Sequence, residues 1–174
     1  MAPSNEQGHT TDGEDLTHLD VHGRPQMVDI VEKDVTQRTA VAQGQIRMSP
    51  TTLSAITAGD VRKGDVLQVA RLAAIMGGKH ASDLIPLCHQ LPGTSFSVEL
   101  EPDDNLPGIV IRVEAKVLSQ TGVEMEALTA VSVGLLTVYD MAKSLDRGMV
   151  IENIHLRYKD GGKSGTWSVD LPST

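Results

Sequence analysis

The sequence predicts an α+β protein in which helices pack on one face of an antiparallel sheet. Residues 95–101 and 109–117 alternate apolar and polar side chains around a turn, the pattern of a β-hairpin with one buried face. Residues 121–148 instead repeat apolar side chains every three or four positions, which predicts a long helix. The expected order of strand, helices, strand, strand, long helix, strand and strand suits a ferredoxin-like arrangement.

The elements before the hairpin begin with a strand and a short helix. Alternation over residues 38–48 predicts a strand with one thinly apolar face. Serine is a good helix cap and proline suits the first helical position, so Ser49 and Pro50 predict a helix start. Gly59 is expected to end this helix.

A second helix is expected after Asp65, which can form a capping box with Gln68. We expect Gly77 and Gly78 to stop it, because glycine disfavours helix continuation. Residues 82–93 follow as a short turn that is interrupted by two prolines.

The long helix is the most apolar element of the chain. No charged side chain lies between Ala127 and Tyr139, so we expect a buried core helix with ionisable ends. Gly148 is expected to close the helix in a left-handed conformation. Lys143 and Arg147 would then lie in its last turn, where cations suit the helix dipole.

Two strands, at residues 150–158 and 166–171, are expected to complete the sheet on either side of a glycine turn. The length of 174 residues suits one domain with a real core. We expect that domain at residues 16–174, after a disordered polar tail at residues 1–15.

Composition excludes several classes of function. A formal net charge of −8 argues against a general nucleic-acid or anionic-membrane surface. The single cysteine, Cys88, excludes an internal disulfide and fits a reducing, cytoplasmic setting. No apolar run reaches the ~18 residues that a membrane span needs, and the N-terminus lacks a signal-peptide pattern.

Two polar motifs in the first half of the chain allow functional readings. Lys63 is either part of an exposed turn beside a helix cap, or a phosphate ligand or acid/base group. Cys88 and His89 lie between apolar residues and prolines. A thiol–histidine catalytic pair is disfavoured because neighbouring side chains diverge, and a second cysteine for zinc is missing. A buried Cys88 with a hydrogen-bonded His89 and a substrate-contacting His89 both remain open.

The ends of the long helix carry the other candidates. Glu124 and Glu126 point to different sides if their segment is helical, and either can simply favour a helix N-terminus. Asp140 and Lys143 are close enough to interact, as a helix-end ion pair or a catalytic pair. Fourteen residues of helix separate Glu126 from Asp140 by ~21 Å. A shared pocket then needs a long ligand or a second subunit, so we expect an oligomer with sites between subunits.

The segment from Lys159 to Gly165 is rich in glycine and lysine without matching the spacing of a nucleotide-hydrolase loop. Its backbone amides and the amines of Lys159 and Lys163 could bind a triphosphate. A simple hairpin turn is the alternative.

Seven segments carry a specific resemblance. They are LTHLD (16–20), MVDI (27–30), KGDV (63–66), DLIPLCH (83–89), TGVEMEALTA (121–130), YDMAK (139–143) and GGKSG (161–165). Together they resemble the molybdenum cofactor biosynthesis protein C family, the cyclic pyranopterin monophosphate synthases. The resemblance covers nearly the whole chain after the tail, and DLIPLCH and TGVEMEALTA are its most specific parts.

The resemblance implies a lyase of molybdenum cofactor biosynthesis. Its substrate would be the cyclised dihydro-GTP intermediate that a radical SAM GTP cyclase makes from GTP. Its products would be cyclic pyranopterin monophosphate and pyrophosphate. The resemblance also implies a ferredoxin-like subunit in a homohexamer, a trimer of dimers with active sites at the dimer interface.

The resemblance also assigns roles by position. Asp140 matches the family's active-site carboxylate, and Lys63 and Lys143 match functional lysines. We expect Lys143 to be the principal general acid/base, with its pKa lowered by burial. The expected substrate contacts are Leu87, Cys88, His89, Glu124, Met125 and Glu126, with Lys159 and Lys163 at the phosphates.

No metal site and no required cofactor are predicted, although Mg²⁺ can accompany a triphosphate. The alternative function is a non-catalytic, ferredoxin-like oligomer that binds a small ligand. Such a protein would need the phosphate lysines but could lose Asp140 and Lys143.

Overall fold

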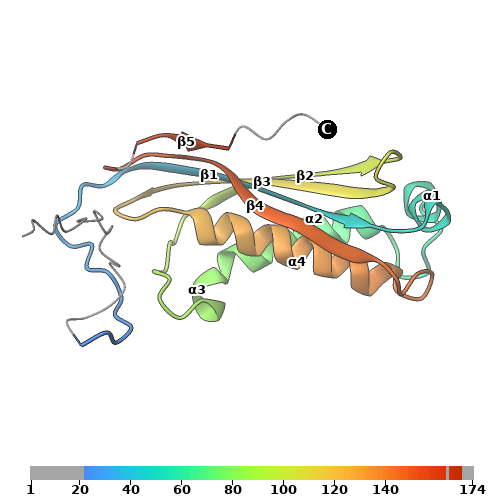
Figure 1. Ribbon diagram of the computed structural model, residues 1–174, viewed down its shortest axis with the longest axis horizontal. Helices are drawn as coiled ribbons and strands as arrows, with labels where there is room; N and C mark the ends of the chain where they lie inside the picture. The colour runs from blue at the N-terminus through green and yellow to red at the C-terminus, as the bar shows by residue number, and fades with distance from the viewer. Residues whose placement is uncertain (1–21, 164, 170–174) are drawn as a thin grey trace, which may run out of the picture.

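The computed structural model describes residues 22–163 and 165–169. Five antiparallel strands form one sheet in the order β2-β3-β1-β4-β5, and α2 and α4 lie against one face of it (Figure 1). The elements are β1 (Thr36–Arg47), α1 (Pro50–Ala58), α2 (Val66–Lys79), α3 (Ala81–Leu84), β2 (Ser95–Asp103), β3 (Gly108–Ser119), α4 (Glu124–Ala142), β4 (Val150–Asp160) and β5 (Trp167–Ser168). This connectivity and strand order are ferredoxin-like, which confirms the predicted fold class.

The predicted tail at residues 1–15 and the LTHLD motif lie outside the described residues, as do Ser164 and the end of the last predicted strand. The single-domain boundaries stay a prediction.

Strand β1 lies in the centre of the sheet, and its packing explains why its own buried face is only thinly apolar. It pairs along its whole length with β3 and also pairs with β4. Ala40, Ala42 and Ile46 are fully buried. A Cβ atom at Gly44 would lie only 2.8 Å from the Val131 side chain. Small residues on β1 therefore let α4 pack directly against the strand.

Helix α4 is the predicted core helix. It packs against α2, β1, β3 and β4, and Ala127, Val131, Leu135 and Val138 are fully buried. Within the described residues it is the one helix with the length and hydropathy of a membrane span, and half of that stretch is buried inside the protein. Its apolar character thus follows from its place between the sheet and α2.

Several local predictions are confirmed. The Ser49 side chain accepts a hydrogen bond from the Thr52 amide, and Gly59 closes α1 with φ +78°. The Asp65 side chain accepts from the Gln68 amide 3.0 Å away, so α2 begins where its cap predicts.

The predicted end of α2 at Gly77 and Gly78 is wrong, because the helix continues to Lys79 and α3 follows within the expected turn. A Cβ atom at Gly77 would lie 2.6 Å from Val133 Cβ, and one at Gly78 would overlap the ring of Phe96. These glycines therefore allow α2 to approach α4 and β2 closely; they do not end the helix.

The predicted closure of α4 by Gly148 is also wrong. The helix ends at Ala142, and Gly148 does not have a positive φ. The Asp146 carboxylate accepts hydrogen bonds of 2.8 Å from the amides of both Ser49 and Gly148. These bonds tie the loop after α4 to the start of α1, so the chain leaves the helical path earlier than expected.

The close contact between α2 and α4 can be tested by whether a larger side chain at Gly77 raises or lowers the free energy of unfolding. Gly77→Ala would stabilise an unhindered helix by about 1 kcal/mol. Because the new methyl overlaps Val133, we expect the free energy of unfolding in urea to fall by about 1–2 kcal/mol. In a Val133→Ala background the same change should become neutral or stabilising. A stabilised single variant would contradict the close contact.

Candidate functional site

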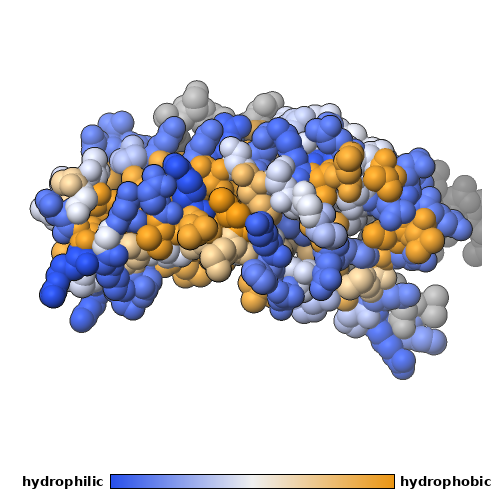
Figure 2. Space-filling model, turned by 180° about the vertical axis from the view of Figure 1, so that it is seen from behind, coloured by the Kyte–Doolittle hydropathy of each residue, from blue (hydrophilic) through white to orange (hydrophobic). Residues whose placement is uncertain are grey.

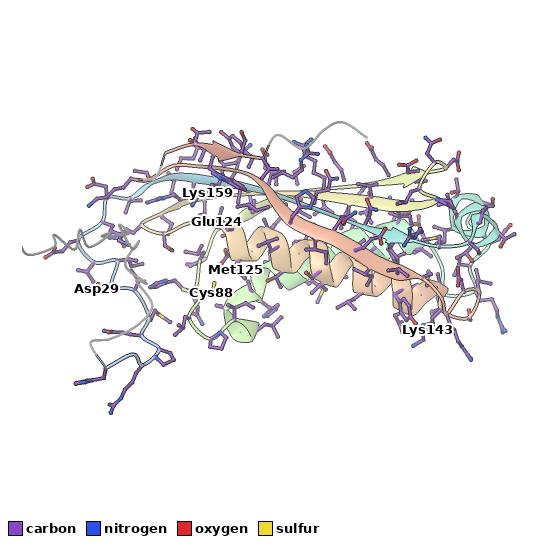
Figure 3. All side chains as sticks on the ribbon, viewed as in Figure 1. Asp29, Cys88, Glu124, Met125, Lys143 and Lys159 are labelled. Atoms are coloured by element: carbon purple, nitrogen blue, oxygen red, sulfur yellow. The ribbon has the colours of Figure 1, made fainter. Side chains whose placement is uncertain are left out.

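The predicted site residues form two groups at opposite ends of α4. Figure 3 shows Glu124, Met125, Cys88 and Lys159 around the N-terminal end of the helix and Lys143 beyond its C-terminal end. The 19 residues of α4 extend for ~28 Å at ~1.5 Å per residue. One copy of the chain therefore does not bring all the predicted residues together.

At the C-terminal end, Asp140 lies between two lysines. Its carboxylate is 2.7 Å from Lys143 Nζ and 2.8 Å from Lys63 Nζ. Lys63 Nζ also donates to the main-chain oxygen of Asp140 at 2.8 Å. The turn at Gly64, with φ +100°, precedes the Asp65 cap and carries Lys63 to the end of α4. Lys63 therefore belongs to the same cluster as Asp140 and Lys143.

This lysine–carboxylate cluster is open to solvent. The side chains of Lys63, Asp140 and Lys143 are 48%, 58% and 52% exposed. The hydrogen bond from Lys143, followed by that from Lys63, lowers the pKa of Asp140 to about 2. The hydrogen bond to Asp140 raises the pKa of Lys143. The expectation of a Lys143 pKa lowered by burial is thus wrong for the isolated chain, because the amine is exposed and paired.

At the N-terminal end of α4 lies a hollow of about 720 Å³, between β1, the start of α4 and the glycine turn after β4. Its cationic lining residues are Lys33, Arg38, Lys159 and Lys163, and its acidic ones are Asp34, Glu124 and Asp160. Antiparallel pairing of β1 with β4 places Ala40 opposite Lys159, which brings Arg38 and the lysines to the same end of the sheet. We call this space the basic hollow.

Arg38 is held rigidly at the basic hollow and was missed by the sequence reasoning. Its guanidinium donates to the main-chain oxygens of Ser119 at 3.2 Å and Gln120 at 3.3 Å. A Cβ atom at Gly162, where φ is +76°, would overlap that guanidinium. The glycine of the GGKSG motif therefore makes room for Arg38. Only the strand pairing reveals this, because nothing in the sequence distinguishes Arg38 from a surface arginine.

Lys33 was also missed. It lies in a turn just after the MVDI motif, and the Gln120 side chain donates to the main-chain oxygens of Val31 at 3.2 Å and Lys33 at 2.9 Å. Gln120 thereby fixes the turn that carries the lysine. The nearby motif was the only sequence signal for this position.

A second hollow of about 380 Å³ adjoins the first. It contains five of the predicted substrate contacts: Leu87, Cys88, His89, Glu124 and Met125. Four residues line both hollows: Lys33, Thr121, Gly122 and Glu124. The two spaces therefore share a wall and form one two-part site, with cations concentrated in one part.

The two glutamates of GVEMEA face different sides, as expected for a helical segment. Glu124 accepts from Lys159 at 3.2 Å. Glu126 is 4% exposed, and its Oε1 lies 3.6 Å from the Cys88 thiol, which donates to it. Its other oxygen, Oε2, has no hydrogen-bond partner among the described residues. Burial raises the pKa of Glu126, so this carboxyl tends toward its neutral form.

Cys88 is a hydrogen-bond donor in this arrangement. Burial, followed by the charge of Glu126, raises the pKa of the thiol to about 11. A thiol with that pKa carries little thiolate at neutral pH, which argues against a nucleophilic role. Within the described residues, no group of three or more histidine, cysteine, aspartate or glutamate side chains could hold a metal ion.

The fold and the adjoining hollows are those of an α+β domain whose cationic compartment is suited to a small anionic ligand. A family model described as MoaC family matches residues 27–162. The chain therefore belongs to the MoaC family, and the resemblance found in the sequence motifs is confirmed.

Relatives of known name match across most of the chain. A protein of Dinoroseobacter shibae named cyclic pyranopterin monophosphate synthase is 56% identical over 155 residues, covering 89% of this chain and 98% of that protein. A Brucella melitensis protein of the same name is 55% identical over 159 residues, covering 91% and 96%. Among solved structures, a de novo designed protein with ferredoxin fold is 12% identical with a TM-score of 0.39, over 76% of this chain and 94% of that one.

The raised thiol pKa predicts slow alkylation of Cys88. At pH 7.5 iodoacetamide should modify it roughly two orders of magnitude more slowly than glutathione. The rate should rise with pH toward a midpoint near 11. Glu126→Gln removes a neighbouring negative charge and should shift the midpoint downward. Circular dichroism at each pH checks that the fold is intact, and a midpoint at the ordinary thiol value would contradict the assignment.

Proposed function

We propose that this protein is a cyclic pyranopterin monophosphate synthase, a lyase of molybdenum cofactor biosynthesis. It converts the cyclised dihydro-GTP intermediate to cyclic pyranopterin monophosphate and pyrophosphate. The observation that carries the proposal is the two-part site at the N-terminal end of α4, where a basic hollow adjoins the hollow of Cys88, His89 and Met125. This arrangement fits a ligand with a polyphosphate at one end and a base at the other. The names of the relatives support the same reaction.

The basic hollow binds the triphosphate. Lys159, Lys163, Lys33 and Arg38 line it, and the Arg38 guanidinium is already fixed by main-chain oxygens. Formation of the cyclic phosphate requires a sugar hydroxyl to attack the α-phosphorus while pyrophosphate leaves. Cations held in place around the leaving group stabilise the charge that develops on it.

The second hollow binds the base and sugar. Burial raises the pKa of Glu126, which favours the protonated form, and that form can donate a hydrogen bond that a carboxylate cannot. Cys88, His89 and Met125 line this hollow, and the Cys88 thiol donates to Glu126 Oε1 behind them. Glu126 Oε2 is buried without a hydrogen-bond partner among the described residues, so a contact with the base requires the carboxyl to turn into the hollow.

The proton transfers require the Lys63–Asp140–Lys143 cluster, which lies about 28 Å away along α4. We therefore propose that a second subunit brings its cluster to this site. Apolar side chains are exposed between the two ends of the helical layer: Val69, Leu72, Met76 and Leu136, at 43–60%. Figure 2 shows apolar side chains gathered in the middle of the side opposite the view of Figure 1. Two copies that pack antiparallel across this face would join each cluster to the partner's hollow.

Such packing would also supply the burial that the cluster lacks in one chain. Removal of water penalises a charged amine and lowers its pKa toward neutrality. Lys143 could then serve as the general acid/base for ring opening and reclosure. The full assembly that we propose is a cytoplasmic homohexamer, a trimer of dimers, supplied with substrate by a radical SAM GTP cyclase.

The reaction is tested by supplying the cyclised dihydro-GTP intermediate and following products by mass spectrometry. Wild type should form cyclic pyranopterin monophosphate and pyrophosphate. Lys143→Ala should lower kcat by at least about 100-fold, because the acid/base group is lost. Parallel assays with Mg²⁺ and with a chelator test whether the ion accompanies the triphosphate.

Arg47→Met is a suitable control, since Arg47 pairs with Glu152 and lines neither hollow. It should leave the rate unchanged. If wild type binds the intermediate and returns it intact, the protein is instead a non-catalytic ligand-binding oligomer.

The shared site is tested by mixing two inactive variants. Lys143→Ala lacks the cluster, and His89→Ala lacks part of the hollow. After subunit exchange, half of the random dimers are hybrids, and each hybrid has one intact site out of two. We expect recovery of roughly a quarter of wild-type activity. No recovery, with subunit exchange verified by mass, would place the whole site within one subunit.

A further inference from the structure

Lys159, which we propose binds the phosphates of the substrate, already has an anionic partner. Lys159 Nζ lies 3.2 Å from Glu124 Oε1, and the two side chains are only 32% and 29% exposed. Both residues line the basic hollow. The Glu124 carboxylate therefore occupies the position on Lys159 that a phosphate oxygen would take.

Gly122 creates the space for this carboxylate. A Cβ atom at position 122 would lie 2.7 Å from Glu124 Cδ and 2.8 Å from its Oε1. Gly122 does not have a positive φ, so the backbone conformation does not require glycine there. The requirement comes from the Glu124 side chain, which folds back over the loop between β3 and α4.

We propose that Glu124 is a built-in competitor for Lys159, displaced when a triphosphate binds and returning when pyrophosphate leaves. The inference rests on the proposed function and adds a specificity role to it. A carboxylate beside a bound polyphosphate is repelled, because like charges at close range disfavour one another. Glu124 lies in the wall shared by both hollows, so the displaced side chain can turn toward the second hollow.

This exchange couples the two parts of the site. A bare polyphosphate breaks the Lys159–Glu124 pair and leaves the carboxylate without a cation. A ligand that also carries N–H donors on a base offers Glu124 a new partner in the second hollow. Binding of each end then favours binding of the other, and the coupling is reciprocal. Glu124 thereby selects the complete substrate over inorganic phosphates, and it hastens the release of pyrophosphate.

Inorganic triphosphate is the probe, titrated calorimetrically into the full chain in the presence of a chelator. Glu124→Gln should bind it roughly fivefold more tightly than wild type, because a competing charge is lost. Gly122→Ala should also raise the affinity for triphosphate, because the added methyl displaces the Glu124 carboxylate from its position beside Lys159. Glu152→Gln is the matched control: Glu152 is 26% exposed and pairs with Arg47 away from the hollow, and its affinity should equal that of wild type.

A double-mutant cycle isolates the pair. In a Lys159→Met background, Glu124→Gln should keep only the small gain that comes from removing like-charge repulsion, well below the roughly fivefold gain in the presence of Lys159. Unchanged or weaker binding by Glu124→Gln would overturn the competition, as would a full gain in the absence of Lys159. A gain for Glu124→Gln without one for Gly122→Ala would refute the role of Gly122. The probe needs no turnover, so these results are independent of whether the enzyme assay succeeds.

Discussion

The close packing of α4 between β1 and α2 is the constraint on which the rest of the structure depends. Cβ atoms at Gly44, Gly77 and Gly134 would each lie within 2.8 Å of a neighbouring side chain, so the helix approaches the strand and the second helix at minimal distance. A helix held this firmly on two sides has fixed ends. The functional groups discussed above lie at one of those ends, on a nearby loop, or, like Arg38 and Lys159, at the adjoining ends of β1 and β4.

The three pairings of ionisable groups differ in burial, and burial decides their chemistry. Asp140 is exposed between two lysines, and its pKa falls to about 2. Glu124 and Lys159 are about one-third exposed, where a charge pair still forms but can be exchanged for a ligand. Glu126 is buried beside a thiol, and its pKa rises. Three carboxylates on one helix thus differ because each meets a different amount of water: one is an exposed ion-pair centre, one is a partly exposed ion pair that we propose a ligand displaces, and one is a buried carboxyl with a raised pKa.

Local sequence rules predicted what depends on neighbours in the chain: the Ser49 cap, the hairpin and the core helix. These rules gave wrong or missing predictions where the local structure depends on a contact between segments that are distant in the sequence. Gly77 and Gly78 look like a helix stop, but their contacts with Val133 and Phe96 come from elements far along the chain. The pairing of β1 with β3 and β4 brings Arg38 to the basic hollow, which no local rule predicts. Helical spacing predicted that Glu126 and Asp140 lie far apart on the core helix, but it could not show that Lys63 joins Asp140 or that Lys159 joins Glu124, because those contacts come from distant segments.

That division makes a second surface necessary for the proposed chemistry. An exposed ion pair such as Asp140–Lys143 keeps both charges at neutral pH, and water screens it. Proton transfer near neutrality requires that pair to be desolvated, and no element of the described chain covers it. The hollow at the other end has the opposite requirement, since its cations must stay accessible to an entering polyanion. A partner that covers the cluster while leaving an entrance to the adjoining hollow meets both conditions, and an antiparallel pair of identical chains can provide two such sites.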